Sequence, residues 1–234
     1  TPGFWAETSI NPLDQKFLKF MGIGKADGTA SQRLVHWLAR TYACKSDLWL
    51  DLHGGARTET IASYVWGWET KIAEIDRFTK QFIVDYTGPF GIFEQQRFPI
   101  GKAAALARMG CGYMLAEAGG SGRRLEKDIR QHEAWITAAL REMGVIKHNQ
   151  SLPSQSPKKF SSIIYRKVDY LRCRKPGLWH PANMTMRVVS KGETLGVVRF
   201  LDGRKTETIR ASHTGQLLWI KDGLRALPTD DLAA

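Results

Sequence analysis

Two short apolar segments of the chain each lead into a side chain that can do chemistry. The first ends in Asp-Leu-His-Gly-Gly at residues 51–55, and the second ends in Ala-Glu-Ala-Gly-Gly at residues 116–120. Ligands of α/β sheets bind at the carboxyl ends of strands, and glycine lets the backbone turn there and approach a ligand closely. His53 and Glu117 would therefore supply a metal ligand and a general base, which are two of the parts needed to activate water on zinc.

The segments that precede these two residues predict the elements that position them. Thr29 and Gln32 have the spacing of a helix capping box, so a helix should follow. Its apolar face is expected to contain Leu34, Trp37, Leu38 and Tyr42. Residues 48–52 predict a buried strand that ends at His53, and residues 113–117 predict another.

Further periodic segments complete the expected sheet and its helices. Strands are predicted at residues 61–68 and 83–86, and helices at 68–82, 100–109 and 124–143. The apolar stripe of the last helix should contain Leu125, Ile129, His132, Ile136, Leu140 and Met143. Strands that alternate with helices in this way are typical of an α/β domain.

The composition changes after residue 148, and this change predicts how the chain is divided. Residues 1–148 form the expected α/β domain, and residues 149–160, rich in Ser, Pro, Gln and Lys, form a linker. Residues 161–234 contain short alternating segments separated by glycine turns, which predicts a small all-β module. Its strands are expected at 163–171, 184–189, 194–200, 206–211 and 216–220.

The motifs and their order along the chain resemble those of the succinylglutamate desuccinylase/aspartoacylase family. The resemblance rests on residues 11–14, 27–34, 51–55 and 117–120, and on turns at 189–196 and 211–215. It implies a zinc-exopeptidase-like mixed sheet flanked by helices, followed by a barrel-sandwich module. It also implies a zinc-dependent amidohydrolase that removes the acyl group from a small N-acyl amino acid or related compound, acting on a carbon–nitrogen bond other than a peptide bond.

The resemblance also implies roles for individual residues. In this family zinc is held by His and Glu of an early HxxE motif and by a later His, which His53 matches. Glu117 matches the general base. An Asn-Arg pair of the family binds the substrate carboxylate, and Lys19 and Phe20 stand in its place here. Lys19 could offer a point charge to a substrate, and Arg123, after the second glycine turn, is a further candidate for substrate binding.

The chain departs from the family in its metal ligands, because none of its six histidines is followed by Glu three positions later. In the family the HxxE motif lies upstream of the region that Thr1 matches, so we expect the domain to lack that N-terminal segment. A single histidine does not hold zinc tightly. Zinc is therefore expected of the complete protein, and a catalytically degenerate homologue that binds a ligand or partner is the alternative.

Composition sets the remaining expectations. The net charge is +11, with most of the excess in the β module, but the basic residues are scattered and form no dense run. Nucleic acid is therefore not the expected partner, although a basic β module that binds it remains a third hypothesis. The expected partner is a small-molecule substrate, and a homo-oligomer is compatible with the sequence. The absence of a long apolar run and the three scattered cysteines favour a cytoplasmic protein without a membrane span.

Overall fold

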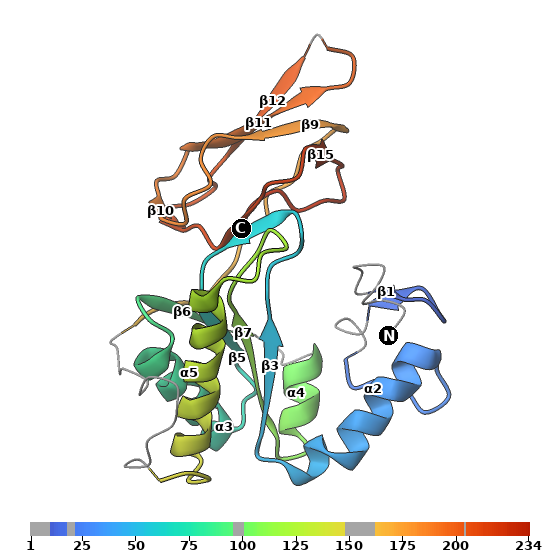
Figure 1. The fold of residues 1–234 in the computed structure, drawn as a ribbon, viewed down its shortest axis with the longest axis vertical. Helices are drawn as coiled ribbons and strands as arrows, with labels where there is room; N and C mark the ends of the chain where they lie inside the picture. The colour runs from blue at the N-terminus through green and yellow to red at the C-terminus, as the bar shows by residue number, and fades with distance from the viewer. Residues whose placement is uncertain (1–9, 18–21, 96–100, 148–161, 204) are drawn as a thin grey trace.

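The computed structural model describes residues 10–17, 22–95, 101–147, 162–203 and 205–234 (Figure 1). Lys19 and the predicted linker at 149–160 lie outside these ranges. Within them, no helix has the length and apolar character that crossing a membrane requires.

A five-stranded mixed sheet forms the centre of the larger part of the molecule (Figure 1). Its strand order is β3-β7-β5-β6-β8, from β3 (Leu48–His53), β7 (Gly112–Glu117), β5 (Tyr64–Trp68), β6 (Phe90–Glu94) and β8 (Ile163–Tyr165). Only the pairing of β5 with β7 is antiparallel. The sheet is flanked by helices, so the predicted mixed α/β fold is confirmed.

Helices pack on both faces of this sheet. The α-helices of the described ranges are α2 (Ala30–Thr41), α3 (Ala73–Tyr86), α4 (Gly101–Ala107) and α5 (Glu126–Glu142). α3 and α5 bury one face around Phe82 and Trp135, whereas α4 covers Tyr113 on the other face. Because successive side chains on a strand point to opposite faces, the odd-numbered residues of β3 and β7 share the α4 face.

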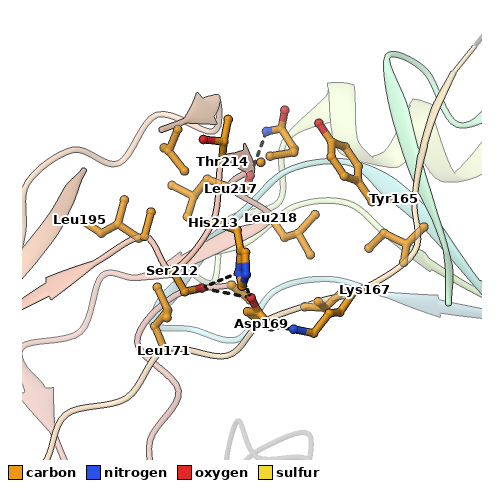
Figure 2. Close-up of a pocket in the computed structure, with 17 residues that line it drawn as sticks. Tyr165, Lys167, Asp169, Leu171, Leu195, Ser212, His213, Thr214, Leu217 and Leu218 are labelled. Carbon is orange, nitrogen blue, oxygen red and sulfur yellow. Dashed lines mark hydrogen bonds and ion pairs between the residues drawn. The ribbon is translucent and has the colours of Figure 1, made fainter. Parts of the chain in front are cut away.

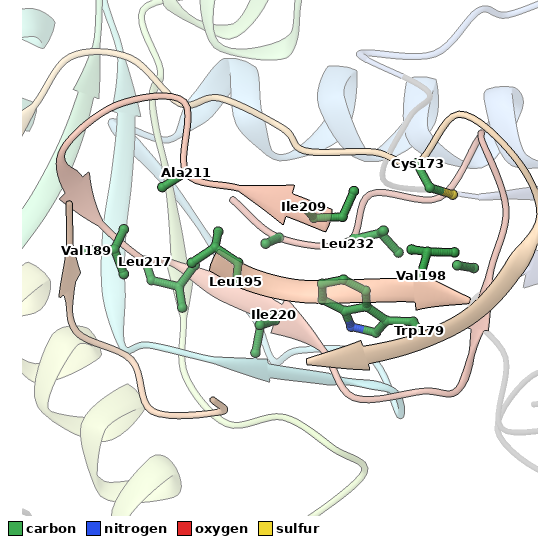
Figure 3. Close-up of a cluster of buried hydrophobic side chains, with 12 residues drawn as sticks. Cys173, Trp179, Val189, Leu195, Val198, Ile209, Ala211, Leu217, Ile220 and Leu232 are labelled. Atoms are coloured by element: carbon green, nitrogen blue, oxygen red, sulfur yellow. The ribbon is translucent and has the colours of Figure 1, made fainter. Parts of the chain in front are cut away.

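The C-terminal strands form smaller sheets beside the central one. β9 (Gly177–Pro181), β11 (Thr194–Phe200), β12 (Thr206–Arg210) and β15 (Arg225–Ala226) form a four-stranded sheet in the order β12-β11-β9-β15. Figure 3 shows the apolar cluster beneath it, in which Trp179 is buried. The expectation that these strands form a barrel-sandwich module stays a prediction.

Short strands join the C-terminal part to the rest of the chain. β14 (Trp219–Lys221) pairs with β4 (Glu59–Ile61), which lies in the connection between β3 and β5.

Two further short pairs lie within one part of the chain each. β10 (Val188–Val189) pairs with β13 (Gly215–Gln216). Near the N-terminus, β1 (Ile10–Asn11) pairs with β2 (Lys16–Phe17), and a 3-10 turn, η2 (Ala43–Lys45), follows α2.

Two strand predictions were wrong. Residues 83–86 belong to α3, because Phe78, Phe82 and Tyr86 continue its aromatic ridge. The strand there is β6, which begins after the turn at Gly88. The segment predicted as the first strand of the β module is the short β8, and it extends the central sheet beside β6.

The predicted helix faces were also misplaced. Leu34, Trp37 and Tyr42 are exposed, whereas Ser31, Val35 and Ala39 are the buried residues of the segment. Ser31 is buried because its hydroxyl and backbone N–H donate to Asp14.

In α5 the predicted stripe lies at the margin of the buried face. Ile129, Ile136 and Leu140 are partly exposed, whereas Trp135 and Ala138 are buried. The Trp135 indole N–H donates to the Tyr86 carbonyl at 3.0 Å, and this contact sets which side of α5 faces the sheet.

Candidate active site

His53 and Glu117 meet at the carboxyl edge of the central sheet. They are register partners on the parallel strands β3 and β7, and His53 Nδ1 lies 3.7 Å from Glu117 Oε1. Both side chains are largely but not fully buried, with exposed fractions of 22% and 17%. The sheet therefore brings together the two residues that the sequence singled out, on one face and within reach of solvent.

Close backbone packing explains the glycines that follow His53. The Gly55 N–H donates to the Gly119 carbonyl at 3.3 Å, so the two chains stay paired beyond the strands. A Cβ on Gly55 would lie 2.8 Å from Ile61 Cγ2 and 3.2 Å from the Gly119 carbonyl oxygen. A larger residue would push the two turns apart and displace the strand ends that carry the site.

Asp51 orients the His53 ring. Its Oδ1 lies 3.1 Å from His53 Nε2, because residues two apart on a strand share a face. Asp51 accepts the Nε2–H, and this leaves the lone pair of Nδ1 on the Glu117 side of the ring. Metal-binding histidines typically donate a hydrogen bond from their second ring nitrogen to a carboxylate in this way.

Two further side chains hold Asp51 from the other side. Lys102 Nζ donates to Asp51 Oδ2 at 3.1 Å, and the Tyr113 hydroxyl donates to the same oxygen at 2.8 Å. Burial would raise the pKa of Asp51, but the hydrogen bond from His53 and the charge of Lys102 together hold it well below its usual range. The pKa of Tyr113 is raised by burial and by the Asp51 charge, so the phenol stays a donor.

Aromatic rings form an apolar wall beside the polar side chains of the site. Trp66 stacks on Trp68 at 5.1 Å, and Trp68 stacks on Tyr113 at 5.5 Å. The Trp68 indole donates to Glu94 at 2.8 Å. Tyr64, the β5 partner of Glu117, has a pKa raised by burial and then by the Glu117 charge. These rings give the site an apolar wall on one side of the two reactive residues.

The sequence predicted His53 and Glu117 but not the residues that hold the His53 ring in place. Asp51 and Tyr113 carried a usable signal, because each lies an even number of residues before a reactive residue on its own strand. Lys102 carried no such signal, since its position depends on how α4 packs across the sheet.

Arg123 is exposed in the turn after β7, where its backbone N–H donates to the Gly120 carbonyl at 3.0 Å. Lys19 lies outside the described residues. His132 packs edge-on against Trp135 at 5.5 Å, and burial lowers its pKa.

A zinc ion finds only part of its ligand set in the described ranges. Those ranges contain no group of three or more His, Cys, Asp or Glu side chains arranged to hold a metal. His53 has the carboxylate-held ring of a metal ligand, but catalytic zinc takes three protein ligands. The described residues alone therefore do not fit zinc.

Comparison with known proteins relates the chain to one group. No family model matches the chain. It is 24% identical over 159 residues to the Nα-acetyl-L-2,4-diaminobutyric acid deacetylase of Halomonas elongata. That match covers 66% of this chain and 46% of the deacetylase, so the chain spans about half the length of this curated relative.

Solved structures agree with the sequence match at the level of the fold. A succinylglutamate desuccinylase/aspartoacylase from Rhodobacter sphaeroides has a TM-score of 0.83 at 20% identity, covering 100% of this chain and 71% of that one. The ectoine utilization protein EutE of Ruegeria pomeroyi, in its product-bound structure, has a TM-score of 0.81 at 21% identity with the same coverage. The resemblance predicted from the motifs is confirmed, because the chain has the fold of succinylglutamate desuccinylase/aspartoacylase family proteins.

Proposed function

We propose that this chain carries the general base and one zinc ligand of a hydrolase that cleaves the amide bond of a small N-acyl amino acid or related compound. The observation that carries the proposal is the His53–Glu117 register pair, with the imidazole oriented by Asp51. The likeness to a protein named as an Nα-acetyl diaminobutyrate deacetylase supports this reaction class.

Glu117 acts as the general base in this proposal. Its carboxylate takes a proton from the attacking water, whose oxygen forms a bond to the acyl carbon. The same proton then passes to the leaving nitrogen as the carbon–nitrogen bond breaks, so the products are a carboxylic acid and an amine. The apolar wall of Trp66 and Tyr64 limits access of other water molecules to the carboxylate.

Zinc is proposed as the cofactor of the complete site, with His53 Nδ1 as one ligand. Asp51 and its donors Lys102 and Tyr113 keep the imidazole turned so that this nitrogen faces Glu117. The described residues do not complete a set of three ligands, so at least one further ligand would come from outside them. Arg123 and Lys19 are proposed to bind the substrate, because their positive charges would attract the carboxylate of an N-acyl amino acid.

The function is tested by measuring amine release from a panel of N-acyl amino acids, with zinc added. We expect release by the unmodified protein and a loss of about 10²–10⁴-fold in Glu117→Gln, because that is what a general base contributes. Glu133→Gln is the matched control, since Glu133 is exposed on α5, and it should keep full activity.

Two results would contradict the proposal. Equal turnover by Glu117→Gln would remove Glu117 from the role of base. No amine release from any substrate, with zinc supplied in excess, would reject hydrolysis by this chain and leave the binding homologue as the better account.

A further inference from the structure

A separate cavity lies between the central sheet and the C-terminal strands (Figure 2). Its volume is about 280 Å³, and none of Asp51, His53 or Glu117 lines it. Apolar side chains from both parts form its walls, namely Ile92 of β6, Tyr165 of β8, Leu171, Leu195 of β11, Leu217 and Leu218. The cavity is about twice the roughly 150 Å³ that holds a benzene ring in a protein interior.

A polar cluster marks one part of the cavity lining. His213 Nδ1 lies 2.5 Å from Asp169 Oδ2, and the Ser212 hydroxyl donates to the same oxygen at 3.1 Å. Lys167 Nζ lies 2.8 Å from the other oxygen, Asp169 Oδ1. Figure 2 shows these side chains converging from the segment after β8 and the turn after β12.

The geometry of this cluster is that of a binding group and differs from that of a nucleophile. In a Ser-His-Asp triad the imidazole lies between the other two residues and uses a different nitrogen for each. Here Nδ1 alone faces both partners, because Ser212 Oγ is 3.2 Å from His213 Nδ1. Ser212 donates directly to Asp169, so the imidazole does not stand between the hydroxyl and the carboxylate as it does in a triad.

The charged groups of this cluster determine whether a cationic or an anionic ligand is favoured. Both Asp169 oxygens already face donors from Lys167, Ser212 and His213, so they are poorly placed to neutralise a bound cation. The side chain of Lys167 is 73% exposed, and its ammonium has donors beyond its contact with Asp169. His213 is 66% exposed, and with Nδ1–H given to Asp169 its ring offers a second donor at Nε2 only in the protonated form. An anionic group is therefore favoured at this part of the lining.

We propose that this cavity binds a small carboxylate with an apolar chain of roughly six carbons, which the cavity volume accommodates with room to spare. The apolar chain would lie against Leu171, Leu195 and Leu218, and the carboxylate would accept a hydrogen bond from the Lys167 ammonium. The site is independent of the proposed hydrolysis, because it shares no side chain with the candidate active site.

Calorimetric titration with hexanoate tests the proposal, using hexylamine, 1-hexanol and acetate as matched probes. Hexanoate should bind saturably in the millimolar range and about tenfold more tightly than hexanol, while acetate and hexylamine should show no saturation. Lys167→Met should weaken hexanoate binding about tenfold. Both Lys167 and the control residue Lys205 are exposed, and Lys205→Met, far from the cavity lining, should bind like the unmodified protein.

Three outcomes would overturn the proposal. Hexanoate that does not bind, or an amine that binds more tightly than the carboxylate, would reject the ligand class. Hexanoate affinity unchanged in Lys167→Met would place the carboxylate elsewhere, including in the candidate active site. Amine release is measured separately, so failure of this proposal leaves the hydrolase proposal intact.

Discussion

His53 has two ring nitrogens, and its neighbours give each of them a different task. Asp51 accepts a hydrogen bond from the Nε2–H, and Nδ1 is then turned toward Glu117. Asp51 is itself held by Lys102, whose ammonium lies 5.1 Å from the centre of the Tyr113 ring. A mostly buried carboxylate with three donors is costly to assemble, and such an arrangement is expected where the orientation of one imidazole matters.

Asp51 makes the stability of the protein depend on pH. Its pKa is lower in the folded chain than the usual value near 4, so its contribution is complete above that value and is lost as the pH falls through the folded pKa. We expect Asp51→Asn to lower the free energy of unfolding by roughly 2 kcal/mol at neutral pH and by progressively less below pH about 4.

Urea unfolding of both proteins between pH about 3 and 7 checks this expectation. Asp27→Asn is the control, because Asp27 is exposed in the turn before α2 and should change stability little at any pH. A stability difference for Asp51→Asn that stays constant down to pH 3 would show that the carboxylate is not preferentially stabilised in the folded state.

At the scale of elements, the site depends on how tightly β5 packs against α3. Gly67 lies on the α3 face of β5, where a Cβ would fall 2.3 Å from Thr79 Cγ2 and 3.2 Å from Ile83 Cδ1. The missing side chain lets the helix approach the strand that pairs with β7 and so supports Glu117.

Gly67→Ala should therefore destabilise the protein by about 1–3 kcal/mol through overpacking, measured by thermal or urea unfolding. Gly112→Ala is the matched control in the same sheet, because the nearest atom to its added Cβ is 3.4 Å away, an ordinary contact. Equal stability of the two variants would mean that α3 can shift without cost.

The elements that could be predicted from the sequence were those with a strong local pattern. β3 and β7 are apolar runs with clear ends, and α2 begins at a capping box in which the Thr29 N–H donates to Gln32 at 2.9 Å. The faces of α2 and α5 could not be predicted, because a polar contact of Ser31 and an indole contact of Trp135 outweighed the apolar periodicity. Neither contact has a signature in local sequence.

At the scale of the whole molecule, the C-terminal strands hold the loops that follow the two reactive residues. β4, in the loop after His53, pairs with β14, and the Thr60 hydroxyl donates to Asp222 at 3.2 Å. Ser121, in the turn after Glu117, also hydrogen-bonds to Asp222. The C-terminal part thus ties together the two segments that shape the site, a role that the sequence division at residues 149–160 did not reveal.

This arrangement explains which part of the site was predictable. His53 and Glu117 lie at strand ends with their own motifs, so local sequence identified them. The tie through Asp222 joins residues more than 100 positions apart, and the cavity beside Asp169 is likewise formed by segments distant in sequence. Such contacts are set by the packing of whole sheets, which periodicity does not encode.

The most direct test of the central claim is hydrolysis in ¹⁸O-labelled water, followed by mass spectrometry of the released acid. If Glu117 activates water for attack on the acyl carbon, the zinc-supplied protein will place one solvent oxygen in the carboxylate product, and Glu117→Gln will produce at least about 10²-fold less labelled acid. Labelled acid formed equally by Glu117→Gln, or none formed by the unmodified protein, would contradict the account.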